Sequence, residues 1–144
     1  MNEREFQISV DIAAPPESVW SVMYEVERWH EWTPSVSGIR VLGKKPLTIG
    51  SRVLVRQPKF PPAVWTVTAL APGRRFDWKS GAPGMWVHAS HAIEPTAAGS
   101  LVRLRLRYEG ALGGLFARWT RDITNRYLSY EAEGLKQRSE SLVR

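Results

Sequence analysis

The side chains best suited to acid–base chemistry in this sequence are His91, Tyr127 and Glu131. A histidine titrates near neutral pH, so His91 could polarise a ligand carbonyl or transfer a proton. The Tyr127 hydroxyl could orient a ligand, or could simply bond to a backbone group. The simpler interpretation of His91 is a core histidine with a satisfied hydrogen bond. The three residues are therefore candidates for catalysis, and the alternatives stay open.

Glu131 falls near the middle of the broad apolar side of a predicted C-terminal helix. A carboxylate in that position must be paired, exposed near the helix end, or raised in pKa. Arg138 lies two turns later on the same side, and an ion pair between the two residues is the simplest expectation.

Other catalytic and cofactor signatures are missing from the sequence. There is no Cys, and therefore no thiol nucleophile and no thiolate metal ligand. Neither a Gly-x-Ser-x-Gly elbow, nor a Gly-rich phosphate loop, nor a His/Asp cluster at metal-ligand spacing occurs. We expect no metal and no cofactor, and whether the protein is an enzyme is left undecided.

A ligand site would instead be built from large apolar side chains, of which seven are Trp. We expect Trp32, Phe60 and Phe116 to border the mouth of a cavity, with Trp65 and Trp78 deeper inside. Phe60 lies in a Pro-rich loop, where core packing explains an apolar ring poorly. The full set of expected ligand-binding residues is Trp32, Phe60, Trp65, Trp78, His91, Tyr108, Phe116, Trp119, Ile123 and Tyr127.

The element that must organise these residues is a helix predicted from about Leu112 to Ser141. Its polar residues fill an arc of only about 120°, so its apolar side is very broad. A helix lying flat on a surface needs a much narrower apolar stripe. The pattern therefore predicts a helix held inside a concave surface.

Strands are predicted to supply that surface. Residues 4–12 alternate strictly between apolar and polar side chains, and two short helical segments follow before Pro34. Six more strand-like segments are separated by short Gly- and Pro-containing turns, which indicates antiparallel pairing. They are Val36–Leu42, Arg52–Gln57, Val64–Leu70, Arg75–Ser80, Met85–Glu94 and Leu101–Glu109. This order predicts an α+β domain in which residues 4–12 pair with residues 101–109.

Hairpin register predicts which strand residues face the helix. We pair Ser80 with Met85 across one turn and Pro95 with Ser100 across the next. Both pairings place alternate residues toward the helix: Phe76, Trp78, Val87, Ala89, His91, Ile93, Val102, Leu104, Leu106 and Tyr108. The outer face then carries an Arg stripe, Arg103, Arg105 and Arg107. That stripe could be a nucleic-acid platform or a solvated surface, and we favour the latter.

The whole chain of 144 residues, with a net charge of +6, fits a single domain spanning 1–144. Its N-terminal residues have no apolar signal core, and no run approaches the length of a membrane span. We expect a cytoplasmic protein that does not bind nucleic acid. Its oligomeric state cannot be read from the sequence.

The segment 12–32, IAAPPESVWSVMYEVERWHEW, resembles the opening of the START-like (SRPBCC) superfamily, in particular its polyketide cyclase/dehydrase-like branch. Glu25 stands where that branch more often has Asp. The likeness continues through Trp65-Thr66-Val67, PGRRFDW at 72–78, Ile93-Glu94-Pro95 with Gly99, Leu112-Gly113, and Gly134-Leu135-Lys136 with Glu140. It implies a helix-grip fold, a seven-stranded curved antiparallel sheet wrapped around the C-terminal helix with an apolar cavity between them.

Members of this superfamily bind lipids, hormones, polyketides and other hydrophobic molecules, and a few catalyse reactions. Three hypotheses follow. The first is binding or carriage of a hydrophobic small molecule between sheet and helix. The second is a cyclase/dehydratase-type enzyme that uses His91, Glu131 or Tyr127. The third is an interaction module that uses the basic outer face. Fold does not choose among them.

Overall fold

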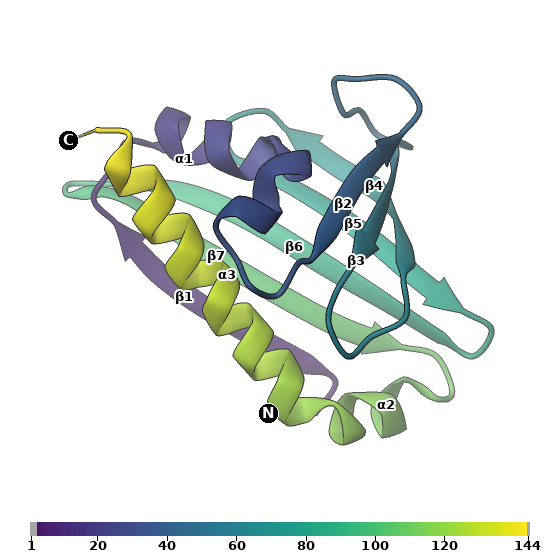
Figure 1. Ribbon diagram of the computed structural model, residues 1–144. Coiled ribbons are helices and arrows are strands. Elements are labelled where there is room, and N and C mark those ends of the chain that lie inside the picture. Colours follow the sequence, from purple (N-terminus) through teal and green to yellow (C-terminus); the bar gives the residue numbers. More distant parts are fainter. Residues whose placement is uncertain (1–2, 144) are drawn as a thin grey trace.

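A curved antiparallel sheet and a long helix that crosses its concave face form the frame of the protein in a computed structural model, which describes residues 3–143 (Figure 1). Within that range the sheet has seven strands in the order β1-β7-β6-β5-β4-β3-β2. The elements in chain order are β1 (Glu5–Ile12), α1 (Pro16–Tyr24), the 3-10 helix η1 (Val26–Glu31), β2 (Gly38–Leu42), β3 (Arg52–Arg56), β4 (Ala63–Ala71), β5 (Arg75–Ala82), β6 (Met85–Thr96), β7 (Gly99–Glu109), α2 (Gly113–Trp119) and α3 (Arg121–Ser141).

The predicted pairing of the first and last strands is confirmed. Val10 of β1 lies opposite Val102 of β7, and the two strands run antiparallel. The helices α1 and η1 then carry the chain from β1 to the other edge of the sheet, where β2 begins (Figure 1). This connection separates β1 from β2 and leaves room for a cavity between the sheet and α3.

Register in the central hairpins decides which residues reach that cavity. The β6–β7 register is as predicted, with Pro95 opposite Ser100. The predicted β5–β6 register is wrong by two residues, because Ala82 rather than Ser80 lies opposite Met85. A two-residue turn suits the strand twist, and Gly84 supplies the positive φ of 89° that it needs. A shift of two residues keeps every side chain on its face.

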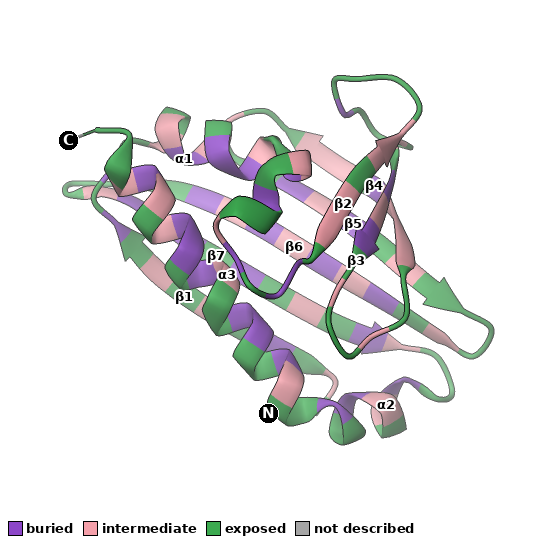
Figure 2. Ribbon diagram, viewed as in Figure 1, coloured by how far each residue is buried: buried purple, intermediate pink, exposed green. Residues whose placement is uncertain are grey.

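Burial follows the predicted faces, as the alternating colours of the strands show in Figure 2. Phe76 and Val102 are fully buried on the inner face, and Trp78 is 4% exposed. On the outer face, Arg103 binds Glu94 at 3.4 Å and Arg107 binds Glu109 at 2.5 Å. Carboxylates thus offset much of the basic stripe, which favours a solvated surface over a nucleic-acid platform.

The predicted single C-terminal helix is wrong in one respect, because it is divided at Thr120 into α2 and α3. The Thr120 hydroxyl donates to the Phe116 carbonyl at 2.8 Å, a back-bond that often bends helices. Figure 1 shows α2 turned away from the axis of α3. As a result, the residues of α2 do not continue the apolar face of α3.

The second half of α3 is fixed against the N-terminal part of the chain. Lys136 donates to the carbonyl of Asp11 at 3.1 Å, and the Ala13 amide donates to the Glu140 carboxylate at 2.9 Å. Gly134 faces the Trp32 carbonyl so closely that a Cβ there would overlap the oxygen. The first half of α3 is therefore the part that remains to line a cavity.

No helix within residues 3–143 combines the length and apolar character needed to cross a bilayer.

Candidate functional site

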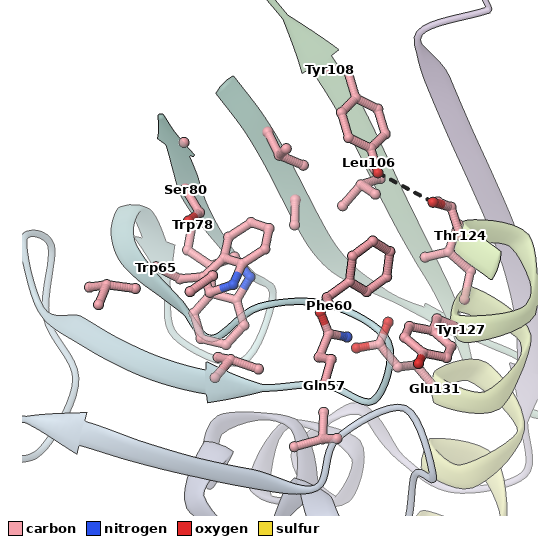
Figure 3. A pocket seen from close by; sticks show the side chains of 18 of the residues that line it. Gln57, Phe60, Trp65, Trp78, Ser80, Leu106, Tyr108, Thr124, Tyr127 and Glu131 are labelled. Atoms are coloured by element: carbon pink, nitrogen blue, oxygen red, sulfur yellow. Dashed lines mark hydrogen bonds between the residues drawn. The ribbon is translucent and has the colours of Figure 1, made fainter. Parts of the chain in front are cut away.

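A cavity of about 410 Å³ lies between the concave face of the sheet, the first half of α3 and the loop between β3 and β4. Figure 3 shows its lining side chains converging from these three sides. Exposed lining residues at the loop and at the β5–β6 turn, Pro61, Pro62, Gly81 and Ala82, mark where the cavity meets solvent. The volume is within the range of small-molecule pockets.

Aromatic rings form the inner wall of the cavity. Trp78 packs against Trp65 with 5.7 Å between ring centroids and against Trp29 with 5.3 Å. Trp29, which was not among the predicted site residues, is 2% exposed, and its Nε1 donates to the Met23 carbonyl at 2.9 Å. Its place in the Val-x-x-Trp pattern of residues 26–29 was the available signal.

The loop of residues 57–62, here called the cover loop, closes the side of the cavity next to α3. The Tyr127 hydroxyl donates to the Pro58 carbonyl, and the Phe60 ring contacts the Tyr127 ring edge-on at 5.7 Å. Lys59 has a φ of 70°, a left-handed conformation that turns the loop back toward the helix. Phe60 is therefore held over the cavity rather than in the core.

His91 lies at the base of the cavity. Its ring stacks on Phe76 at 4.3 Å, and its Nδ1 lies 3.1 Å from the Phe76 carbonyl oxygen, to which it donates. Burial lowers the pKa of His91 to about 4, so the ring is neutral at physiological pH. Because Nδ1 carries the proton, Nε2 is left as an acceptor.

Replacing His91 with Leu should lower the free energy of unfolding by roughly 1–3 kcal/mol, because the Phe76 carbonyl loses its side-chain partner. Denaturant unfolding would measure the loss. Arg105→Leu on the outer face of β7 is the control and should change stability by less than about 0.5 kcal/mol. Equal stability of the His91 variant and the native protein would contradict the structural role of this hydrogen bond.

Glu131 also lines the cavity, and the expected ion pair with Arg138 is wrong. Arg138 instead binds Glu31 at 2.6 Å. Among residues 3–143, no hydrogen bond or ion pair to the Glu131 carboxylate is formed, and burial raises its pKa to about 7. Figure 3 shows the Gln57 amide and the Glu131 carboxylate both directed into the cavity. Gln57 was missed because a polar residue at the end of a strand gives no distinctive signal.

The hydroxyl groups at the α2 end of the cavity are bonded to one another. Tyr108 and Thr124 hydroxyls lie 3.2 Å apart, and the Thr124 hydroxyl donates to that of Thr120 at 3.4 Å. The Thr120 hydroxyl in turn donates to the Phe116 carbonyl. In that order, the Tyr108 hydroxyl donates to Thr124 and keeps its acceptor lone pairs for a ligand.

Three of the predicted ligand-binding residues lie away from the cavity. Trp32 borders a shallow depression beside Gly134, because η1 turns its ring against Trp29. Trp119 is 82% exposed, because the division at Thr120 removes it from the apolar face of α3. Ile123 is half-buried and does not line the cavity. The seven that do line it are Phe60, Trp65, Trp78, His91, Tyr108, Phe116 and Tyr127.

The arrangement is suited to holding an apolar molecule and offers few free donors. His91 and Tyr127 both donate to backbone carbonyls, and within the described residues no hydrogen bond joins either of them to Glu131. Residues 3–143 contain no cluster of three or more potential metal ligands. The one ionisable side chain directed into the cavity without a partner in that range is Glu131.

Comparison with known proteins places this geometry in a family. Residues 3–140 match the family described as polyketide cyclase / dehydrase and lipid transport. No curated protein has a significant match to this sequence.

Solved structures share the fold at low sequence identity. The Zhui aromatase/cyclase from Streptomyces sp. R1128 is 19% identical with a TM-score of 0.78, and the match covers 98% of this chain and 96% of that one. Protein TTHA0849 from Thermus thermophilus is 18% identical with a TM-score of 0.76, over 97% and 99% of the two chains. A START superfamily protein from Mycobacterium smegmatis is 18% identical with a TM-score of 0.75, over 96% and 98%. With its helix-grip architecture and a match that spans nearly all of its residues, this chain belongs to the polyketide cyclase / dehydrase and lipid transport family.

Proposed function

We propose that this protein binds and carries a hydrophobic small molecule in the cavity between the sheet and α3. The observation that supports this most is the aromatic-lined cavity of about 410 Å³ beneath the cover loop. Burial of apolar surface would drive binding, and the few polar groups would orient the ligand. The engagement of His91 and Tyr127 with backbone carbonyls supports carriage more than proton transfer.

Titration with a panel of sterols, fatty acids, fatty amines and aromatic polyketides tests this proposal. A ligand that enters the cavity should change Trp emission saturably, because Trp65 and Trp78 line it. It should also bind with a negative heat-capacity change. If no compound in the panel gives a saturable signal, carriage of such molecules is rejected.

Phe60→Ser is expected to weaken that binding by about tenfold to a hundredfold, because it removes the apolar ring that covers the ligand. The fold should be unaffected, since Phe60 lies in a loop that forms no strand pairs. Leu115→Ser is the matched control, because Leu115 is 67% exposed on α2 and does not line the cavity. Equal loss of affinity in both variants would contradict a site beneath the cover loop.

A second candidate function, cyclase/dehydratase-type catalysis, is favoured by the pKa of about 7 at Glu131. A carboxyl group that titrates near the operating pH is a suitable general acid. The ionised carboxylate could take the α-proton of a bound β-hydroxyketone, and the resulting carboxyl group could return that proton to the β-hydroxyl, which leaves as water as the α–β double bond forms. Glu131→Gln should then lower the dehydration rate of a β-hydroxyketone probe by about a hundredfold or more. An unchanged rate would remove Glu131 from this role.

A further inference from the structure

Glu131 is poorly explained by folding. Its carboxylate faces a cavity walled mainly by aromatic and aliphatic side chains, and an ionised carboxylate there is costly unless something pairs with it. Arg138, the nearest basic residue along this side of the helix, is committed to Glu31. A partner supplied by the ligand would remove this cost.

The other polar groups of the cavity cannot provide that partner. Tyr127 donates its proton to Pro58, and His91 donates its Nδ1 proton to Phe76. Arg105 is exposed on the outer face of β7, so within residues 3–143 no cationic side chain is directed into the cavity. Gln57, which lines the same cavity, is neutral and supplies no charge.

The groups around the Glu131 carboxylate favour one kind of ligand head group over another. A carboxylate only accepts hydrogen bonds, so its complement is a donor, and a cationic donor forms the stronger bond. The Phe60 and Tyr127 rings, in edge-to-face contact at 5.7 Å, both line this part of the cavity. Aromatic faces attract cations and give no favourable contact to an anion. A ligand with a carboxylate head would meet like charge at Glu131.

We propose that the cognate ligand is an apolar or aromatic amine whose protonated nitrogen pairs with the Glu131 carboxylate on the side of the cavity that carries Phe60 and Tyr127. This inference rests on the proposed carriage of a hydrophobic molecule and adds the chemistry of its head group. The apolar body of the ligand lies against Trp65 and Trp78. Fatty acids are disfavoured on the same grounds.

Three probes with one aromatic body and different heads test the assignment: 2-(2-naphthyl)ethylamine, 2-(2-naphthyl)ethanol and 2-naphthylacetate. Isothermal titration at about pH 8, where Glu131 is mostly ionised and the amine is protonated, compares their affinities. The amine should bind at least about tenfold more tightly than the alcohol, and the acetate most weakly. Equal affinities of amine and alcohol would overturn the inference and leave the proposed carriage intact.

Glu131→Gln keeps the shape of the side chain and removes its charge. It should lower the affinity for the amine by about tenfold and change that for the alcohol by less than about twofold. Glu133→Gln, on the exposed face of the same helix, is the matched control and should alter neither. An amine preference that survives Glu131→Gln would overturn the inference. Failure of all three probes to bind the native protein would also overturn the inference, whereas the panel titration decides the proposed carriage.

Discussion

Replacing Gly134 with Ala should lower the free energy of unfolding by about 3 kcal/mol, the upper end of overpacking costs. A Cβ added at this position would overlap the Trp32 carbonyl oxygen and would lie only 3.0 Å from the Trp32 ring carbon Cε3. Backbone cannot move aside as a flexible side chain can. The segment around Trp32 is further held by Thr33 and Ser35, both buried and bonded to each other at 2.8 Å. The melting temperature should fall by roughly 10 °C.

Gly38→Ala is the matched control for this substitution. Its added Cβ would meet only the Arg56 side chain, at 3.6 Å, an ordinary van der Waals contact. Its effect on unfolding should stay within about 1 kcal/mol. Thermal or urea unfolding of the two variants measures the difference. Equal stability of the two variants would show that α3 can shift away from the Trp32 segment at little cost.

The second large effect is a pH dependence of the free energy of unfolding that arises from the titration of Glu131. Burial raises its folded-state pKa from 4.5 to about 7, so between these values the folded protein binds more protons than the unfolded chain. Stability from this residue is therefore lost as the pH rises through that window. The shift corresponds to ~3 kcal/mol, and water entering the cavity should reduce the observed value to about 2 kcal/mol.

Glu131→Gln should remove this loss, and the variant should be more stable than the native protein by about 2 kcal/mol at about pH 8. At about pH 4.5 the two proteins should differ by less than about 0.5 kcal/mol. His91 acts in the opposite direction, because its lowered pKa makes stability rise between about 4 and 6.5. Comparing variant with native protein at each pH cancels that contribution. A stability difference that does not change with pH would contradict the raised pKa.

The fold could be predicted well because its signals are local and repeated. Strict alternation in residues 4–12 and in the central strands fixed the faces, and a two-residue error in the β5–β6 hairpin could not change them. The division of the C-terminal helix could not be predicted in the same way. The division lies at Thr120, whose hydroxyl donates to the Phe116 carbonyl, and no local pattern distinguishes such a hydroxyl from one that points to solvent.

The cavity was predicted better than its polar contacts. Rings on the inner faces, such as Trp78 and Tyr108, follow from strand periodicity. The partner of Arg138 does not follow from periodicity. Helix spacing places Glu131 on the same side as Arg138, but the tertiary fold brings Glu31 to it instead. That Gln57 and Glu131 line the same cavity likewise depends on how the cover loop folds back on α3, which no local pattern encodes.

The attachment of the cover loop has a consequence for the timing of ligand exchange. Residues 57–62 lie between the paired ends of β3 and β4, where Val55 lies opposite Ala63, so the loop can swing without breaking a strand pair. Its contacts with α3 include one hydrogen bond, from Tyr127 to Pro58, and one ring contact, from Phe60 to Tyr127. Loop motions of this kind take nanoseconds to microseconds, far less time than unfolding. A ligand carried as proposed would be covered by this one short loop, so its rate of exchange could change without any change in the stability of the sheet.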